Sequence, residues 1–367
     1  MKKYFKVLAF ISMLILLMAF AGCSGSETEP SGVATDPEEG AEAGQVEERV
    51  SMELRLAHFW PATHPSETDL AQGLARIINE ATDGQITVTS YPGETLLTAA
   101  EIYDGVCTGV ADIGISCFAY TRGRFPLVEV FELPGVIYNN SKVASKVAWE
   151  GIKELNPAEV QDTKLLMVIT TGPGDLFTRT PVKTLEDIQG MEIRATGLSA
   201  KTLEKLGAVP VAMPQSDTYE AMSKGVVQGN LSPQETLEGW RHAEVCDYVT
   251  LTPFLYNTLF FTTINLDVWN SIPAHLQTAI EKAVDEFYED VAIGLWDMQN
   301  ESAIKFATEE CNVEILTLSD EEQARWIELV EPVQEDFLKE MAALGLDGAE
   351  ALEVAKKLSD KYNAVYK

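Results

Sequence analysis

Basic side chains are scarce in this chain. Its 367 residues include 27 Lys and Arg against 57 Asp and Glu, which gives a formal net charge of -30 at pH 7. A negative field of this strength repels polyanions, so nucleic acid is not expected as a partner. An anionic small molecule would need a local cationic anchor inside its binding pocket.

The short motifs of common catalytic centres are also absent. The sequence has no HExxH zinc motif, no Gly-x-Ser-x-Gly elbow, no GxxxxGK phosphate loop and no GxGxxG dinucleotide motif. Residues 172–174 (Gly-Pro-Gly) match only a fragment of such patterns. The histidines show no zinc-ligand spacing; they are His58, His64, His242 and His275. Catalysis is therefore not expected, and neither a cofactor nor a metal is predicted.

Cysteines are few. Cys23 lies near the N-terminus, and Cys107, Cys117, Cys246 and Cys311 match no zinc or redox spacing. Export from the cytoplasm would permit disulfides, and four cysteines can pair in three ways. Buried free thiols are the alternative that we expect.

The N-terminus has the pattern of a lipoprotein signal peptide. Three lysines in the first six residues precede an apolar run, 7–21, and Ala21-Gly22-Cys23 ends the run. An apolar core of about 15 residues is typical of a secretory signal, whereas a membrane span needs about 20. We expect residues 1–22 to be removed and Cys23 to be acylated, which would anchor the protein to a membrane outside the cytoplasm. An uncleaved helix and plain secretion are the alternatives.

Residues 23–50 form an acidic segment rich in Ser, Gly, Pro and Ala, without an aromatic residue. Such a composition cannot bury enough apolar surface to offset the entropy of ordering, so it predicts a flexible tether. Loss of three lysines with the signal would change the net charge from -30 to about -33. The remaining length is sufficient for two lobes with two cores.

From residue 51 onward, strand and helix patterns alternate. Strands are expected at 53–58, 85–91 and 111–117, with helices at 66–81 and 98–108 between them. This order predicts a parallel sheet flanked by helices.

A second α/β series follows the first. Its expected strands and helices, in chain order, are 164–170, 184–188, 191–195, 199–206, 209–213 and 216–225. The stretch 274–310 has helical apolar spacing over about ten turns and no internal proline, which predicts one long helix packing across both lobes. Two amphipathic helices, 320–344 and 349–367, are expected to end the chain.

Four stretches carry a family resemblance. They are Tyr91-Pro-Gly, Gly109-Val-Ala-Asp-Ile-Gly, Leu185-Glu-Asp-Ile-Gln-Gly-Met-Glu-Ile-Arg194 and Glu220-Ala-Met-Ser-Lys-Gly-Val-Val-Gln-Gly229. In order and spacing, the chain from Leu54 to about Leu318 resembles the extracytoplasmic solute receptors of tripartite ATP-independent periplasmic (TRAP) transporters, the dicarboxylate-receptor-like family.

The resemblance implies an α/β, two-lobed periplasmic-binding-protein-like fold with hinge strands. Lobe I would comprise 51–171 and about 258–298, and lobe II would comprise 172–257 and about 299–367 with the C-terminal helices. The lobes would close over a small organic acid and deliver it to the membrane subunits of the transporter. A receptor that feeds a sensor kinase is an alternative, and a secreted enzyme is a weaker one.

The resemblance also implies that Arg194 binds the ligand carboxylate. Arg194 lies near the end of an expected strand, where α/β folds bind ligands, and a guanidinium matches a carboxylate bidentately. Many relatives have a second arginine about 20 residues earlier, but this chain has Gly174 followed by Asp175. A monocarboxylate is therefore favoured. Asp175 could accept a hydrogen bond from a ligand hydroxyl or amine, or it could be a solvated loop acid.

Family geometry places the ends of other strands around the ligand. These residues are largely apolar and aromatic, and they suit an acid with an aromatic or branched hydrocarbon body. The expected lining is Phe59, Trp60, Cys117, Phe118, Tyr120, Met213, Pro214, Ser232, Pro233, Phe254 and Tyr256. Some relatives hold a metal just after Ser232-Pro233, but Gln234, Glu235 and Trp240 provide too few ligands to predict one.

Overall fold

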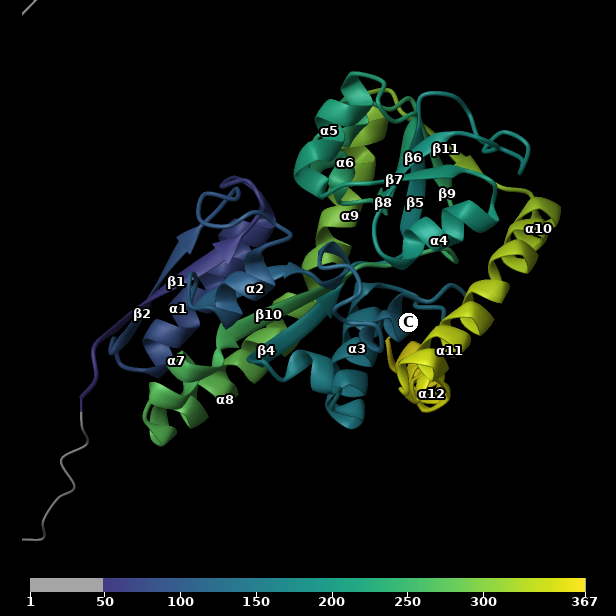
Figure 1. Cartoon of the computed structure of the whole chain (residues 1–367). Helices are drawn as coiled ribbons and strands as arrows, with labels where there is room; N and C mark the ends of the chain where they lie inside the picture. The colour runs from purple at the N-terminus through teal and green to yellow at the C-terminus, as the bar shows by residue number, and fades with distance from the viewer. Residues whose placement is uncertain (1–48, 367) are drawn as a thin grey trace, which may run out of the picture. The chain divides into compact units, whose positions relative to one another are not determined.

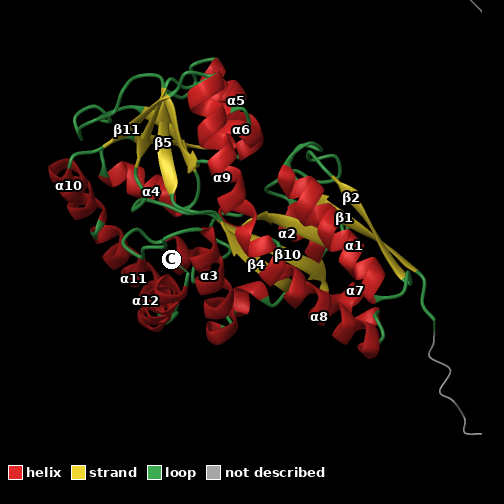
Figure 2. Cartoon of the chain, turned by 180° about the vertical axis from the view of Figure 1, so that it is seen from behind, coloured by secondary structure: helices red, strands yellow, loops and turns green. Residues whose placement is uncertain are grey.

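The computed structural model describes residues 49–366, which contain two β-sheets with helices packed around them (Figures 1 and 2). The predicted signal peptide, the acylation at Cys23 and nearly all of the predicted tether lie outside the described residues. Among the described residues, no helix combines the length and the apolar character needed to cross a membrane.

The sheet of lobe I has five strands in the order β2-β1-β3-β10-β4. They are β1 (Met52–His58), β2 (Ile86–Tyr91), β3 (Ile113–Cys117), β4 (Thr163–Thr170) and β10 (Leu259–Asn265). β1 pairs in parallel with β2 and β3, as the βαβ order predicts, whereas β10 is antiparallel to β3 and β4. The helices of this lobe are α1 (Gln72–Ala81), α2 (Ile102–Cys107), α3 (Ser141–Leu155), α7 (Leu266–Ser271) and α8 (Ala274–Asp290).

The sheet of lobe II has six strands in the order β11-β9-β5-β8-β6-β7. They are β5 (Gly174–Thr178), β6 (Glu192–Ala195), β7 (Val209–Ala212), β8 (Gly229–Pro233), β9 (Tyr248–Leu251) and β11 (Glu314–Thr317). Its helices are α4 (Leu198–Lys205), α5 (Gln215–Ser223), α6 (Thr236–Gly239) and α9 (Leu295–Lys305). Separate apolar clusters pack on this sheet, and a larger one forms the core of lobe I.

One expected helix of lobe II is a turn. At 184–188, Asp187 accepts hydrogen bonds from the backbone N–H groups of Lys183 and Thr184, both at 2.9 Å. A short polar side chain that binds nearby backbone donors competes with helix formation.

Two chain connections join the sheets, one from β4 to β5 and one from β9 to β10. They lie side by side, because the N–H of Thr171 donates to the carbonyl of Thr258 at 3.0 Å and the N–H of Gly174 donates to that of Tyr256 at 2.6 Å. These two hydrogen-bonded segments form one of the connections between the lobes.

The predicted single helix over 274–310 is wrong. α8 ends at Asp290, a 3-10 turn covers Ala292–Gly294, and α9 begins at Leu295. The side chains on both sides of the break are buried, and a change of direction lets α8 pack on α1 in lobe I while α9 packs on α6 in lobe II. The expected packing across both lobes is therefore confirmed, although the helix is interrupted.

The C-terminal helices do not all pack on lobe II, to which the sequence assigned them. They are α10 (Asp320–Val330), α11 (Pro332–Leu344) and α12 (Gly348–Val365). α10 contacts α4 of lobe II, but α12 packs along α3 of lobe I, and Figure 1 shows the C-terminus beside that lobe. The apolar face of α12 joins the lobe I core, so its burial there corrects the expected boundary.

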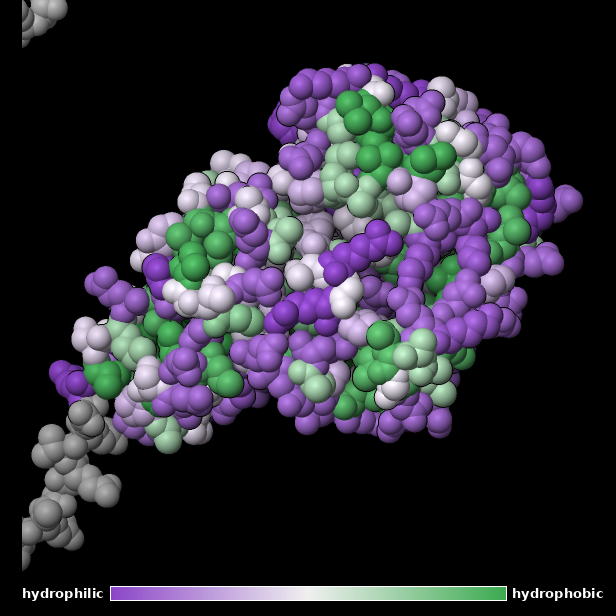
Figure 3. All heavy atoms as spheres, in the orientation of Figure 1, coloured by the Kyte–Doolittle hydropathy of each residue, from purple (hydrophilic) through white to green (hydrophobic). Residues whose placement is uncertain are grey.

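The four cysteines of the described part are free thiols, as expected; Cys117 and Cys246 are buried, and Cys107 and Cys311 are half-buried. Hydrophilic side chains cover most of the face seen in Figure 3, and apolar ones form small separate groups.

Candidate functional site

Arg194 is a buried cation on β6 of the lobe II sheet, between β8 and the edge strand β7. It is the third residue of β6 and only 2% exposed. Its Nε donates a hydrogen bond to the carbonyl of Met213 at 3.0 Å. No carboxylate of residues 49–366 lies within 4.0 Å of the guanidinium. Because an unpaired buried charge is costly, this arrangement favours an anion as the missing partner.

Arg194 faces a small cavity of about 20 Å³ between the two sheets, here called the inner cavity. Lobe I contributes mainly rings, lobe II contributes mainly polar groups, and Tyr256 and Thr258 come from the connection between β9 and β10. The lining residues are Phe59, Trp60, Tyr120, Arg194, Thr196, Gln215, Pro233, Glu235, Thr236, Trp240, Tyr256, Thr258 and Phe260.

Aromatic rings pack against one another along one wall of the inner cavity. The ring centroids of Phe59 and Trp60 are 4.3 Å apart, and the Phe260 ring lies 5.4 Å from that of Trp60. Trp240 from lobe II stacks on Phe59 at 6.0 Å. Such a wall offers flat apolar faces to a ligand ring.

A hydrogen bond crosses the inner cavity between the lobes. The Tyr120 hydroxyl of lobe I accepts from the backbone N–H of Gln215, at the start of α5, at 3.0 Å. Burial raises the pKa of Tyr120, and the positive charge of Arg194 opposes this shift only in part. Tyr120 is therefore a neutral phenol that can donate its proton to an anion beside Arg194.

His242 lies behind Arg194 and adds no positive charge. Its Nδ1 accepts hydrogen bonds from the side-chain amides of Gln215 at 3.3 Å and Asn230 at 3.2 Å. Burial and the nearby Arg194 charge lower the pKa of His242 to about 3. The imidazole is thus neutral at physiological pH, and Arg194 is the only cation in the lining of the inner cavity.

The structure brings six of the predicted ligand-site residues into the inner cavity. They are Phe59, Trp60, Tyr120, Arg194, Pro233 and Tyr256. Three others support it from behind: the carbonyl of Met213 accepts from Arg194, Pro214 precedes Gln215, and Ser232 accepts from the Gln215 amide at 3.3 Å.

The other predicted lining residues lie elsewhere. Cys117 is fully buried at the end of β3 and does not line the inner cavity. Phe118 packs in the lobe I core, 5.1 Å from the ring of Phe261. Phe254 lines a different small hollow beside Leu133. These side chains turn into their own cores, because the last residue of a strand can face either side of its sheet.

Asp175 is also outside the inner cavity. Its two oxygens accept from the Thr252 backbone N–H and from the Gln234 amide, both at 2.6 Å. Burial raises the pKa of Asp175 to about 6. It is a buried, hydrogen-bonded residue of β5 rather than a solvated loop acid, and it does not line the inner cavity.

Sequence reasoning missed several lining residues. Thr196 and Gln215 follow β6 and β7 closely, so the strand-end rule could have found them. Phe260 is inside an apolar strand and resembles ordinary core. Glu235 and Trp240 were considered only for a metal, and no group of three or more His, Cys, Asp or Glu residues within 49–366 could hold one.

The comparisons with known proteins agree on one family. Residues 56–340 match the model of bacterial extracellular solute-binding proteins, family 7. The C4-dicarboxylate-binding periplasmic protein DctP of Rhodobacter capsulatus is 28% identical over 291 residues, 76% of this chain and 85% of that protein.

Two solved structures share the fold closely. A marine metagenome TRAP solute-binding protein specific for aromatic acid ligands, in complex with metahydroxyphenylacetate, is 29% identical; the alignment covers 85% of this chain and 99% of that one with a TM-score of 0.80. A TRAP solute-binding protein from Rhodoferax ferrireducens with copurified benzoate is 25% identical. The alignment covers 86% of this chain and 99% of that one, and the TM-score is again 0.80. The chain therefore belongs to family 7 of the bacterial extracellular solute-binding proteins, the receptors of TRAP transporters, and is a binding protein rather than an enzyme.

Proposed function

We propose that this protein is the extracytoplasmic receptor of a TRAP transporter for a small monocarboxylate with an aromatic body. The ligand carboxylate would bind Arg194, and the ring would pack on the wall of Phe59 and Trp60. The observation that carries the proposal is a buried guanidinium with no carboxylate partner in an aromatic-lined cavity.

The free Nη groups of Arg194 match the two oxygens of a carboxylate. A hydrogen bond between charged groups is worth about 1.5 to 3 kcal/mol, and a bidentate pair also fixes orientation. Tyr120 and Thr196 line the same cavity and can donate further hydrogen bonds to the anion.

A C4-dicarboxylate is the second candidate, because the Rhodobacter capsulatus relative is named for such ligands. The lining of the inner cavity supplies only one cation for two carboxylates. At Gly174, where many relatives have a second arginine, an added Cβ would lie 2.6 Å from the Tyr256 ring. Because this ring occupies the space that a second cationic side chain would need, a ligand with one carboxylate is favoured over a ligand with two.

The relatives support an aromatic body. The marine protein is described as specific for aromatic acids, and the Rhodoferax ferrireducens protein copurified with benzoate. The stacked rings of this chain provide the corresponding apolar wall.

Thermal shift of the full-length protein in mild detergent tests the proposal with benzoate, phenylacetate, succinate and benzamide. Benzamide keeps the ring and removes the charge, and succinate adds a charge and removes the ring. A ligand at 100 times its Kd adds about 2.7 kcal/mol to stability. We expect benzoate or phenylacetate to raise the Tm by several degrees and the other two to leave it unchanged. A shift with succinate alone would favour the dicarboxylate.

We also propose that Cys23 carries a lipid anchor and that the closed receptor docks on transporter membrane subunits. Inhibition of lipoprotein signal peptidase with globomycin should cause the precursor to accumulate. An unacylated mature Cys23 in mass spectrometry would remove the anchor. Co-purification of a sensor kinase in place of transporter subunits would favour the alternative receptor role.

A further inference from the structure

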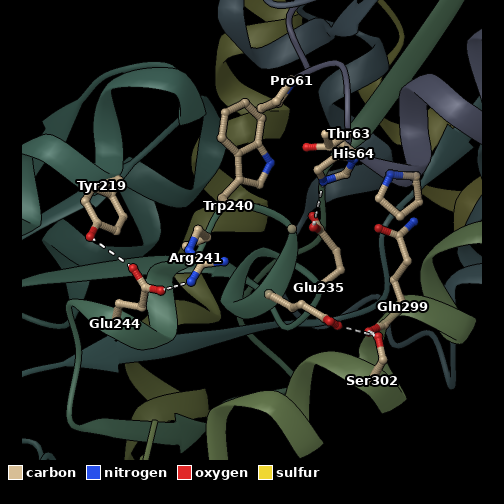
Figure 4. A pocket seen from close by; sticks show the side chains of 13 residues that line it. Pro61, Thr63, His64, Tyr219, Glu235, Trp240, Arg241, Glu244, Gln299 and Ser302 are labelled. Atoms are coloured by element: carbon tan, nitrogen blue, oxygen red, sulfur yellow. Dashed lines mark hydrogen bonds and ion pairs between the residues drawn. The ribbon is translucent and has the colours of Figure 1, made fainter. Parts of the chain in front are cut away.

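Two buried polar side chains face each other across the lobe interface. His64 lies in the loop after β1 of lobe I, and Glu235 follows β8 of lobe II. Their side chains are 2% and 4% exposed, and His64 Nε2 lies 3.8 Å from Glu235 Oε2. Figure 4 shows the imidazole and the carboxylate pointing toward each other. These two residues are called the cross-lobe pair.

Both facing atoms of the cross-lobe pair lack a hydrogen bond. A separation of 3.8 Å is too long for one, and neither atom has another partner among residues 49–366. Buried polar atoms are nearly always paired, since an unsatisfied one costs about 1 to 3 kcal/mol. Both atoms are therefore available to a polar group.

The hydrogen-bonding role of His64 Nε2 follows from the contact of the other ring nitrogen. The Nδ1 of His64 accepts from the backbone N–H of Ser66 at 3.0 Å, so the ring proton is on Nε2, which is a donor. Burial raises the pKa of Glu235, and His64 opposes this shift only in part; in its ionised form the carboxylate is an acceptor. His64 is also held in place, because a Cβ added at Gly239 of α6 would lie only 2.5 Å from its Nε2.

Glu235 lies on the boundary between two spaces. It lines the inner cavity together with Arg194, and it also lines an outer pocket of about 710 Å³ next to Trp240 and Arg241 (Figure 4).

The other acids of the outer pocket have partners. Glu244 binds Arg241 and the Tyr219 hydroxyl, and Glu238 accepts from Ser302 at 2.6 Å. The cross-lobe pair is the unsatisfied part of this wall.

We propose that the cross-lobe pair binds a hydroxyl group on the body of the acid that Arg194 holds. This inference rests on the proposed function and narrows the ligand class to hydroxylated aromatic monocarboxylates. A hydroxyl fits because it donates to the Glu235 carboxylate and accepts from His64 Nε2 at once. A second carboxylate would be repelled by Glu235, and an ammonium group has no lone pair for the His64 donor.

The pair would also couple recognition to closure. His64 and Glu235 come from different lobes, so a hydroxyl that bridges them stabilises the closed arrangement more than the open one. Glu235 is thus a specificity-determining residue, and His64 is its partner on the opposite lobe.

Isothermal titration of the full-length protein tests the inference with matched acids: benzoate with its 2-, 3- and 4-hydroxy derivatives, and phenylacetate with its 3- and 4-hydroxy derivatives. In the wild type, at least one hydroxylated acid should bind at least about tenfold more tightly than its parent. In Glu235→Leu, this ratio should fall to about one.

Control variants separate the pair from its surroundings. Glu238→Gln, on the exposed face of α6, should keep the wild-type ratio. His64→Phe keeps a ring but removes the donor, so it should lower the ratio in part. If Glu235→Leu does not fold, Glu235→Gln should still lower the ratio severalfold, because it turns a charge-assisted hydrogen bond into a neutral one.

Two results would overturn the inference alone: parent acids bind without any preference for a hydroxyl, or the preference survives in Glu235→Leu. Failure of every acid to bind would instead overturn the proposed function, and the inference with it.

Discussion

The two lobes contribute different chemistry to the inner cavity. Lobe I supplies mainly rings, those of Phe59, Trp60, Tyr120 and Phe260, whereas lobe II supplies Arg194 and most of the polar side chains around it. Apolar side chains and the cation of the cavity are therefore provided mainly by different lobes. Under the proposed function, we expect a ligand to gain both only when the lobes meet, which would favour the closed form.

The largest effect should come from removing the cation of lobe II. Arg194→Met should weaken benzoate binding about 100-fold by isothermal titration, because the carboxylate loses its charged partner. The melting temperature of the ligand-free protein should not fall, since an unpaired buried charge is removed. In Arg124→Met, which breaks an ion pair with Asp162 on lobe I, the affinity should be unchanged. Equal losses in the two variants would contradict the assignment.

Blocking the contact between the lobes should have the next largest effect. Gly197 has φ of +51°, and an added Cβ would lie 2.7 Å from the Cβ of Ala119 in lobe I. Gly197→Ala should therefore weaken benzoate binding about tenfold and leave a larger radius of gyration in X-ray scattering with ligand present.

Gly190→Ala is the matched control. Gly190 has φ of +72°, but nothing lies within 4 Å of its added Cβ, so this variant tests backbone strain without the clash. A similar loss of affinity in both variants would mean that strain, rather than blocked closure, is responsible.

Removing one ring from the aromatic wall of lobe I should have a smaller effect on affinity. Phe59→Leu keeps the apolar character but removes ring faces, so benzoate should bind severalfold more weakly. The preference for benzoate over benzamide should persist, because Arg194 is intact. Phe337→Leu alters a buried ring of α11; it should lower the Tm and leave the affinity unchanged. If Phe59→Leu lost the preference for the charged ligand, the division of roles between lobes would be wrong.

The smallest effect concerns stability alone. Burial raises the pKa of Glu132 to about 8, from an ordinary 4.5, and the backbone N–H of Leu259 that it binds at 2.9 Å opposes this only in part. Between these pH values the folded protein keeps a proton that the unfolded chain has lost. The free energy of unfolding should therefore fall as pH rises from about 4.5 to 8.

Glu132→Gln cannot ionise and keeps a carbonyl for Leu259. In thermal melting, the Tm of this variant should equal that of the wild type at pH 4.5 and exceed it by a few degrees at pH 8.5. Glu80→Gln, on the exposed surface of α1, should leave the Tm unchanged at both pH values. A wild-type advantage at pH 8.5 would show that the Glu132 carboxylate stabilises the fold as an anion.

The sequence predicted the parts of the fold that depend on local patterns: the βαβ order of lobe I, strands β6 and β7 of lobe II, and the place of Arg194 near the end of β6. It did not predict the break between α8 and α9 or the packing of α12 on α3, because both depend on which lobe buries a given apolar face. Amphipathic spacing shows that a face is buried, but it does not identify the partner.

The candidate site was predicted in part for a similar reason. Phe59, Trp60 and Tyr120 follow strand ends and do reach the inner cavity, whereas Phe118 and Phe254 turn into other apolar regions. The cross-lobe pair had no sequence signal, since His64 and Glu235 are 171 positions apart and meet only where the lobes touch.

A crystal structure of the protein with benzoate tests the central claim most directly. The account predicts a closed form with the carboxylate on the Nη groups of Arg194 and the ring against Phe59 and Trp60. A carboxylate bound elsewhere, such as beside Arg241 in the outer pocket, with Arg194 still unpaired, would contradict it.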